Sequence, residues 1–301
     1  MTEKTYHFMA GLPRSGSTLL SAILNQNPRF YSGPSSPVVP TMLTIEQSLN
    51  QDELFLAYPK NDFARNLIGS VLIQYYADTD KPIIFEKNRS WVSRINYIPG
   101  YFGIENPKII YPVRDIGEIL ASFISMIQRN PHIVNERVNF IDQSLIQNGI
   151  PINDHNRCQA IAGGGILGQS LDGLKKALSE GYRANIHFVE YSDLVSNTKE
   201  TMEKLYDFIE EDYFDHDFDN IQNVHQENDV QIYGFTDMHE VRKSIESTAT
   251  PPKEILPESV LNSIKDAEFW RQLPELENKK ENTFFGQIIN NDTTEEDTRF
   301  I

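Results

Sequence analysis

The sequence predicts an α/β fold in which helices cover both faces of a central parallel sheet. Short apolar runs alternate with longer segments of helical periodicity, and continuous apolar strands are typical of parallel sheets buried on both faces. In addition, the glycine-rich turn Gly11-Leu12-Pro13-Arg14-Ser15-Gly16 lies between the first apolar run and the first helical pattern. Strand, glycine-rich turn and helix, in this order, form an arrangement that binds phosphate.

The elements are predicted from periodicity and from turn residues. We predict strands at 5–9, 81–86, 108–113 and 185–191, and helices at 17–27, 61–77, 90–97, 115–128, 157–178 and 198–209. Asp115 and Glu118 form a capping-box pair for the helix at 115–128. Pro99-Gly100 ends the predicted helix at 90–97. The three glycines at 163–165 either break their helix or permit close packing. Residues 130–155 have the pattern of an irregular or helical insertion.

The glycine-rich turn has P-loop spacing, Gly-x4-Gly followed by Ser17-Thr18, with one change. Ser17 stands where a P-loop has the lysine that reaches the β- and γ-phosphates of a nucleoside triphosphate. The change disfavours kinase or ATPase chemistry but leaves an anion cradle of backbone amides at residues 15–18, to which Arg14 adds a cation. We therefore predict a three-layer fold of the P-loop type. The alternative is an ordinary strand-turn-helix with glycine in its turn.

Composition limits the other functions. The net charge of −16 argues against a general binder of nucleic acid or acidic membranes. Cys158 is the one cysteine, which suits a reducing compartment. No apolar run reaches transmembrane length and no signal-peptide core is evident, so we expect a cytoplasmic protein. We expect a single domain at 1–272 and an acidic, partly disordered tail at 273–301; a homodimer is left open.

Three cations follow predicted strands: Arg14, Lys87 and Arg114. In an open parallel sheet, ligands bind beyond the carboxyl ends of the strands. We expect these cations to converge at one edge, provided that their strands are neighbours. Such a cluster is what a polyanionic ligand needs in a protein of this net charge.

The run Pro13-Arg14-Ser15-Gly16-Ser17-Thr18-Leu19-Leu20 resembles the 5′-phosphosulfate-binding loop of sulfotransferases that use 3′-phosphoadenosine 5′-phosphosulfate (PAPS). It is most similar to the loop of tyrosylprotein sulfotransferases and their bacterial-type relatives. The resemblance extends over residues 6–209, with a weaker echo to Ser244. It implies in-line transfer of a sulfuryl group from PAPS, with 3′-phosphoadenosine 5′-phosphate (PAP) as product and without a metal.

Further segments that resemble the family imply roles for single residues. Arg114 and Ser122 would hold the 3′-phosphate, and Lys87 would contact the transferring group. The loop amides and side chains of Arg14, Ser15, Gly16, Ser17 and Thr18 would hold the 5′-phosphosulfate, whereas Tyr191, Arg242 and Lys253 would lie near the nucleotide. Each side chain has an ordinary alternative: a structural ion pair for Arg114, a surface lysine for Lys87 and a core tyrosine for Tyr191.

The sequence departs from the tyrosylprotein enzymes at the general base. Ser35 stands where that family has a glutamate. Glu86, Glu46 or a histidine could take the role, although Glu86 would point to the opposite face of its strand from Lys87. The departure puts peptide tyrosine in doubt as the acceptor, which could equally be a saccharide, a lipid, a small metabolite or another protein side chain.

Two other functions stay open. An atypical P-loop kinase or hydrolase would depend on a magnesium-bound triphosphate, which Ser17 disfavours. A non-catalytic PAPS- or nucleotide-binding protein would keep the pocket without a base, and the missing glutamate favours this reading.

Overall fold

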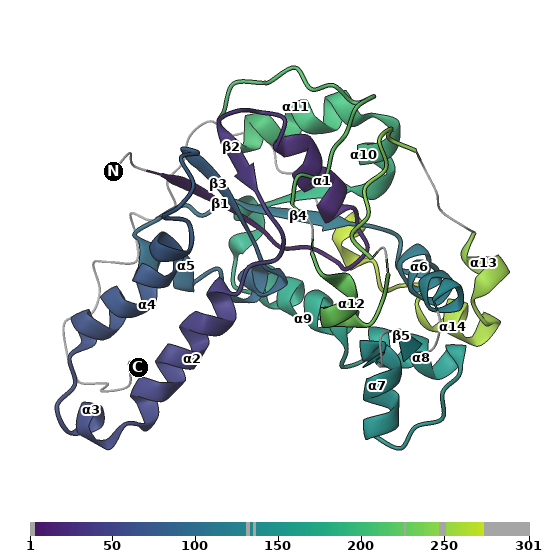
Figure 1. Cartoon of the computed structure of the whole chain (residues 1–301), viewed down its shortest axis with the longest axis horizontal. Helices are drawn as coiled ribbons and strands as arrows, with labels where there is room; N and C mark the ends of the chain where they lie inside the picture. Colours follow the sequence, from purple (N-terminus) through teal and green to yellow (C-terminus); the bar gives the residue numbers. More distant parts are fainter. Residues whose placement is uncertain are drawn as a thin grey trace.

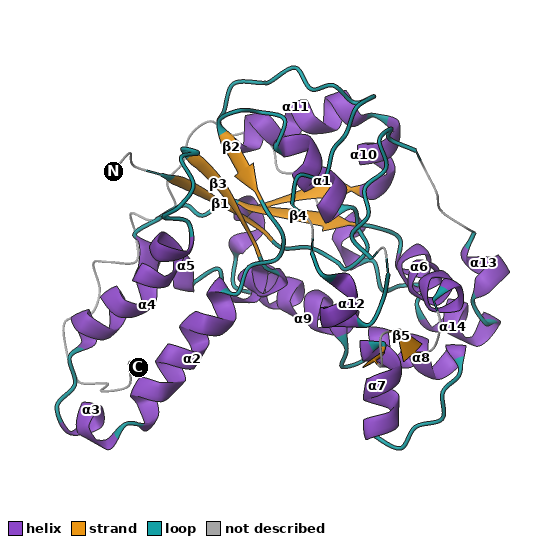
Figure 2. Ribbon diagram, in the orientation of Figure 1, coloured by secondary structure: helices purple, strands orange, loops and turns teal. Residues whose placement is uncertain are grey.

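The computed structural model describes residues 4–273, apart from 131–132, 135–136, 226, 237 and 247–250. The predicted acidic tail therefore lies outside the described residues from position 274 on. Five parallel strands form the central sheet in the order β2-β3-β1-β4-β7 (Figure 2), which confirms the predicted α/β fold. These strands are β1 (Thr5–Met9), β2 (Phe30–Ser32), β3 (Ile83–Lys87), β4 (Ile109–Val113) and β7 (Ile186–Glu190).

Neighbouring residues of each strand face opposite sides of the sheet, and both sides are apolar. Phe8 belongs to one buried core and Met9 to the other. The Met9 side is covered by α1 (Ser17–Leu24), α10 (Tyr191–Ser196) and α11 (Thr198–Ile209), which Figure 1 shows together. The Phe8 side packs against α4 (Asn61–Tyr75), η1 (Arg89–Arg94), α5 (Tyr97–Phe102), α6 (Ile116–Arg129) and α9 (Ile166–Ser179).

The strand order brings together the strand ends that carry Arg14, Lys87 and Arg114. β1 lies between β3 and β4, with Met9 paired to Lys87 on one side and to Ile110 on the other. Because all three strands are parallel, their carboxyl ends meet at one edge of the sheet. The expected neighbourhood of these strands is confirmed.

Two predicted helix boundaries can be compared with the structure. Asp115 caps α6, since its Oδ1 accepts a hydrogen bond from the Glu118 amide at 2.8 Å. The prediction that Pro99-Gly100 ends a helix is wrong, because both residues lie within α5. Pro99 is the third residue of α5, and an amide in the first turn has no intrahelical partner to lose.

The predicted helix at 157–178 is two helices, α8 (Asp154–Ala162) and α9, separated at the three glycines. A Cβ on Gly165 would lie 1.9 Å from the carbonyl oxygen of Ala160. The glycines therefore permit the sharp turn that separates α8 from α9. The sequence analysis did not predict β2, α2 (Val38–Gln51) or α3 (Glu53–Ala57).

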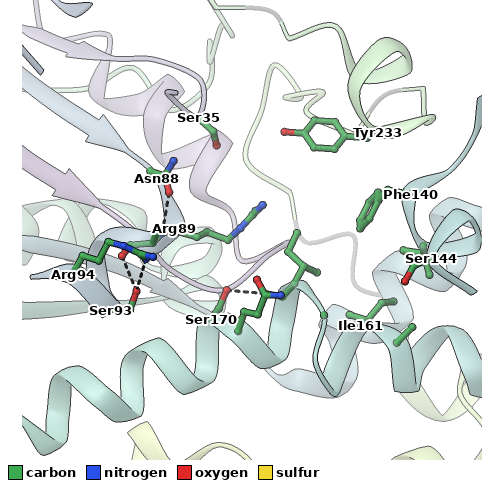
Figure 3. A pocket seen from close by; sticks show the side chains of 16 residues that line it. Ser35, Asn88, Arg89, Ser93, Arg94, Phe140, Ser144, Ile161, Ser170 and Tyr233 are labelled. Carbon is green, nitrogen blue, oxygen red and sulfur yellow. Dashed lines mark hydrogen bonds between the residues drawn. The ribbon is translucent and has the colours of Figure 1, made fainter. Parts of the chain in front are cut away.

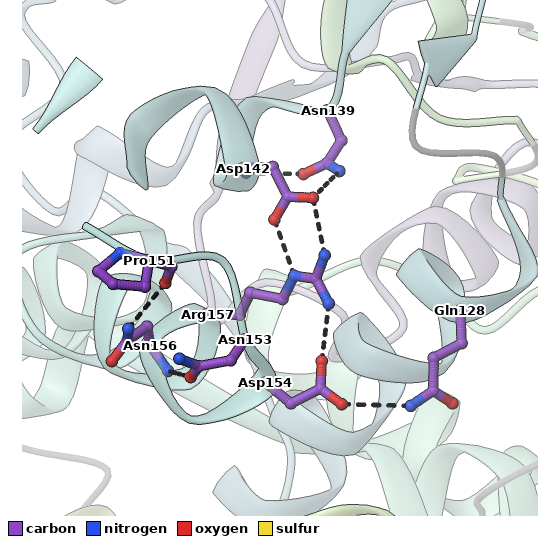
Figure 4. Close-up of polar contacts among 8 residues, drawn as sticks. All are labelled: Gln128, Asn139, Asp142, Pro151, Asn153, Asp154, Asn156 and Arg157. Carbon is purple, nitrogen blue, oxygen red and sulfur yellow. Dashed lines mark hydrogen bonds and ion pairs between the residues drawn. The ribbon is translucent and has the colours of Figure 1, made fainter. Parts of the chain in front are cut away.

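The insertion after α6 contains the short hairpin β5 (Ile133–Val134) and β6 (Arg137–Val138), followed by α7 (Phe140–Gln147) and α8. A polar network joins α7 to α8 (Figure 4). The fully buried Asp142 carboxylate accepts two hydrogen bonds of 2.8 Å from Arg157, whose third contact is to Asp154 at 2.7 Å. This bidentate pair fixes the distance between the two helices.

The remaining elements of the described chain lie around these layers. They are η2 (Tyr182–Asn185), α12 (Asp229–Tyr233), α13 (Pro252–Ile255), α14 (Glu258–Ser263) and η3 (Phe269–Gln272). None of the helices in the described part of the chain combines the length and the apolar composition that crossing a bilayer requires.

Candidate active site

The turn between β1 and α1 has three residues with positive φ and is hydrogen-bonded to β4. Gly11 and Gly16 have φ values of +107° and +88°, and Arg14, which is not a glycine, has a φ of +58°. The Leu12 amide donates to the carbonyl of Pro112 at 2.9 Å, and the Ser15 hydroxyl donates to the carbonyl of Leu12 at 2.6 Å. Left-handed residues turn successive amides inward, which is the geometry of an anion cradle.

A cavity of about 500 Å³ opens beside this turn, and we call it the loop cavity. It is bounded by the turn, by one face of α6, by Tyr191 and by the segment at 238–246. Five arginines line it: Arg14, Arg89, Arg114, Arg129 and Arg242. In a chain with a net charge of −16, such a concentration of cations favours a polyanionic ligand.

Arg14 and Ser122 meet in this cavity. Nε of Arg14 donates to Oγ of Ser122 at 3.3 Å, and its Nη1 donates to the carbonyl of Met238. Burial lowers the pKa of Arg14, and the like charges of Arg114 and Arg129 lower it further. An anion in the cavity would relieve this repulsion.

Arg114 lies between the turn and the aromatic ring of Tyr191. Its guanidinium stands 4.1 Å from the centre of that ring and donates to the carbonyl of Arg14 at 3.1 Å. Its Nε pairs with Glu118 at 2.8 Å, so the structural ion pair named as the alternative does form. Tyr191 begins α10 and also lines the cavity, so it is not a tyrosine enclosed in the core.

Lys87 ends β3 beside the start of the turn. Only 7% of its surface is exposed, and burial lowers its pKa to about 8, while Glu227 raises it and Arg89 lowers it. No described residue forms a hydrogen bond or an ion pair with its ammonium group. A buried lysine without a partner among the described residues would gain from pairing with an anion, although Lys87 is not among the residues that line the loop cavity.

The two glutamates considered as bases are engaged elsewhere. Glu86 is fully buried and accepts hydrogen bonds from Ser36, Tyr76 and Trp91, and burial raises its pKa. Glu46, on α2, accepts a hydrogen bond from Tyr101 at 2.8 Å. Neither lines the loop cavity, so both hold structure together.

Other predicted site residues divide between the cavity and its surroundings. Gly16, Ser17, Thr18 and Arg242 line it, Arg242 being 3.7 Å from Glu246. The Ser15 side chain is buried within the turn and does not line the cavity. Lys253 is exposed on α13, which contacts α6, and it is not among the residues that line the loop cavity. Its place near the nucleotide stays a prediction.

The sequence analysis did not identify a histidine held by carboxylates. Nδ1 of His239 lies 2.6 Å from Oδ1 of Asp229 and 3.2 Å from Oε2 of Glu227, and the ring lines the loop cavity. Arg89 and Arg129 were missed as well. Arg129 lies seven residues after Ser122, on the same face of α6, so helical periodicity could have found it. His239 is ten and twelve residues from Asp229 and Glu227 in the sequence, and no helical or strand periodicity links these positions.

A second cavity, of about 650 Å³, lies on the other side of Arg89 (Figure 3), and we call it the insert cavity. Its walls come from η1, α7, α8, α9 and Tyr233. Ser35, the residue at the position of the missing glutamate, also lines it. Arg89 lines both cavities and therefore marks their junction.

Comparison with known proteins identifies the family of the chain. The model of a family described as the sulfotransferase family matches residues 7–215, more than half of the chain. No curated protein sequence matches.

Solved structures of low identity align with the chain. The sulfotransferase domain of the Synechococcus PCC 7002 olefin synthase is 17% identical, with 91% of this chain and 98% of that chain covered and a TM-score of 0.49. The sulfotransferase domain from the curacin biosynthetic pathway is 15% identical, with coverages of 91% and 93% and a TM-score of 0.44. A retinol dehydratase solved in complex with retinol and PAP is 15% identical, with coverages of 90% and 81% and a TM-score of 0.44.

Proposed function

The chain belongs to the sulfotransferase family, and on that premise we propose that it transfers a sulfuryl group from PAPS to a hydroxyl or amine of an acceptor. One observation carries the proposal. Arg14, Lys87 and Arg114 lie at or after the carboxyl ends of three neighbouring parallel strands, and the turn that carries Arg14 is P-loop-like with Ser17 in place of the lysine. PAPS supplies the sulfuryl group and a bisphosphorylated leaving group.

The loop cavity has the donor set that a molecule with two separate anionic groups requires. The turn amides at residues 15–18, with the side chains of Ser17 and Thr18, would hold the 5′-phosphosulfate, and Gly16, Ser17 and Thr18 line the cavity. Arg114 and Ser122 would hold the 3′-phosphate, because a guanidinium binds phosphate oxygens in a bidentate manner and the hydroxyl adds a donor. Tyr191, whose ring is in cation–π contact with Arg114, would lie against the nucleotide.

Lys87 and Arg14 would stabilise charge during transfer. As the bond between sulfur and the bridging oxygen breaks, negative charge accumulates on that oxygen. A buried ammonium stabilises such charge more strongly than an exposed one, because little water screens it. The Lys87 ammonium, nearly inaccessible and without a partner among the described residues, suits this role.

We assign the general base to His239. A proton on Nδ1, held by Asp229 at 2.6 Å, leaves the lone pair of Nε2 free to take the acceptor's proton. The acceptor oxygen then bonds to sulfur while the bond to the bridging oxygen breaks, and the proton ends on Nε2. His239 is the one histidine that lines the loop cavity among the described residues. With this assignment the chain would have a base, which disfavours a non-catalytic binding protein.

The test is transfer from sulfur-35-labelled PAPS to a panel of alcohols, phenols and amines, with PAP formation measured at the same time. We expect label in at least one acceptor, and a loss of at least 100-fold in Lys87→Met. The matched control is Lys199→Met, which removes an exposed lysine of α11. Equal rates in Lys87→Met and the control would contradict the assignment.

A further inference from the structure

The insert cavity has an unusual charge for this protein. The chain carries 43 acidic and 27 basic residues, yet none of the described residues that line the cavity is acidic. Two of them, Arg89 and Arg94, are basic. A cavity lined by two guanidinium groups and no carboxylate attracts an anion.

Both arginines retain donors for a ligand. The Arg89 side chain points into the cavity (Figure 3), and no described residue forms a hydrogen bond or ion pair with it. Arg94 donates to Oγ of the neighbouring Ser93 at 3.1 Å and has no carboxylate partner in the described chain. Each guanidinium carries five N–H donors, so most of these donors are unused.

The rest of the lining suits an organic molecule. Apolar side chains from α7, α8 and α9 form one wall: Phe140, Ile141, Ala160, Ile161 and Ile166. Hydroxyl and amide groups from Ser35, Asn88, Ser93, Ser144, Gln169 and other residues complete the lining. A volume of about 650 Å³ lies within the usual range for a small-molecule site, roughly 300–1,000 Å³.

The cavity also leads to the proposed base. Tyr233 lines it, and the Tyr233 ring lies 5.4 Å from the ring of His239, centre to centre. Arg89 lines both this cavity and the loop cavity. A molecule in the insert cavity thus lies next to the site where transfer would take place.

We propose that the insert cavity is the acceptor site and that the acceptor is a hydroxyl-bearing organic anion whose acidic group is held by Arg89 and Arg94. The acceptor role rests on the proposed sulfotransferase function. The anion-binding site is argued from the lining of the cavity alone. Carboxylate, sulfonate and phosphate share the chemistry that two guanidinium groups recognise. The apolar wall selects acceptors with an aromatic or aliphatic body over free sugars.

A matched pair of fluorescent probes tests the anion site. 8-Anilinonaphthalene-1-sulfonate and N-phenyl-1-naphthylamine have the same aromatic body, but only the first has an anionic group. We expect the folded protein to bind the sulfonate at least tenfold more tightly than the neutral amine. Arg94→Gln should abolish the preference, Arg94→Lys should retain part of it, and the exposed-arginine control Arg65→Gln should leave it unchanged.

PAP binding, measured by calorimetry on the same samples, separates this inference from the proposed function. Arg94 lines only the insert cavity, so Arg94→Gln should bind PAP like the parent. Equal binding of the two probes, or a preference that survives Arg94→Gln, would overturn the anion site. A clear preference in a protein that does not bind PAP would overturn the acceptor role.

Discussion

Nδ1 of His239 lies 2.6 Å from Oδ1 of Asp229, and the backbone amide of His239 donates to the other oxygen of the same carboxylate at 2.9 Å. The two contacts fix both the ring orientation and the tautomer. In our assignment, His239 uses Nε2 to accept the proton. The loop that carries the histidine and the helix that carries the carboxylate would both be needed to assemble this proposed base.

His239→Asn should lower kcat by about 100- to 10,000-fold, the usual contribution of a general base. The Kd for PAP should stay within threefold of the parent value, because the base acts on the acceptor. Asp229→Asn should lower kcat by at least tenfold, since the ring loses its fixed tautomer. Rate and PAP titrations on both variants test this, and an unchanged kcat in His239→Asn would exclude the histidine as the base.

Lys87 should make PAP binding depend on pH above neutrality. Its pKa in the free protein is about 8, below the ordinary value of 10.5. Bound phosphate favours the charged form, so binding takes up a proton once the pH exceeds 8. We expect the Kd to rise by up to about tenfold per pH unit between pH 8 and 9.5, the limit for one proton. Calorimetry should show a flat profile in Lys87→Met and the parent slope in Lys199→Met.

Gly16→Ala should weaken PAP binding by at least tenfold. Gly16 has a φ of +88°, and an added Cβ would lie 2.8 Å from Cδ2 of Tyr191. The clash would push the ring away from Arg114, which lies against it. Gly103→Ala is the control, because Gly103 also has a positive φ, +68°, but nothing lies within 4 Å of its added Cβ. Similar PAP affinities in the two variants would show that the turn does not depend on this contact.

Arg157→Ala should destabilise the fold by about 3–5 kcal/mol, because it leaves the Asp142 carboxylate buried without its bidentate partner. Arg65→Ala removes a surface ion pair and should cost about 0–1 kcal/mol. Urea unfolding of the two variants gives the comparison. A difference smaller than 1 kcal/mol would mean that the α7–α8 network does not stabilise the walls of the insert cavity.

The sequence predicted the sheet and the cations at its edge for one physical reason. Parallel strands buried on both faces are continuous apolar runs, so the sequence pattern predicted the strands. The carboxyl ends of parallel strands share one edge of the sheet, so the same strands predicted that Arg14, Lys87 and Arg114 lie near one another. The strand β2 was missed because three residues carry too little periodicity. Similarity in the sequence did not reveal that Lys253 lies on a helix that contacts α6, apart from the residues that line the loop cavity.

The base and the insert cavity depend on contacts between distant segments. His239 and Asp229 are ten residues apart in a region without long elements, and nothing in their spacing predicts a contact. The insert cavity needs the helix break at 163–165, whose two possible effects could not be distinguished from the sequence alone. The sequence places Arg89 just after the strand that ends at Lys87. Its position between two cavities follows only from the packing of η1 against α9.

The most direct test of the central claim is calorimetric titration of the purified protein with PAP and, separately, with ATP and magnesium, alongside Arg14→Ala and Arg114→Ala. The account predicts tight binding of PAP to the parent protein, a loss of at least tenfold in each variant, and no binding of magnesium-ATP. Binding of magnesium-ATP without binding of PAP would contradict the sulfotransferase assignment and favour an atypical P-loop kinase.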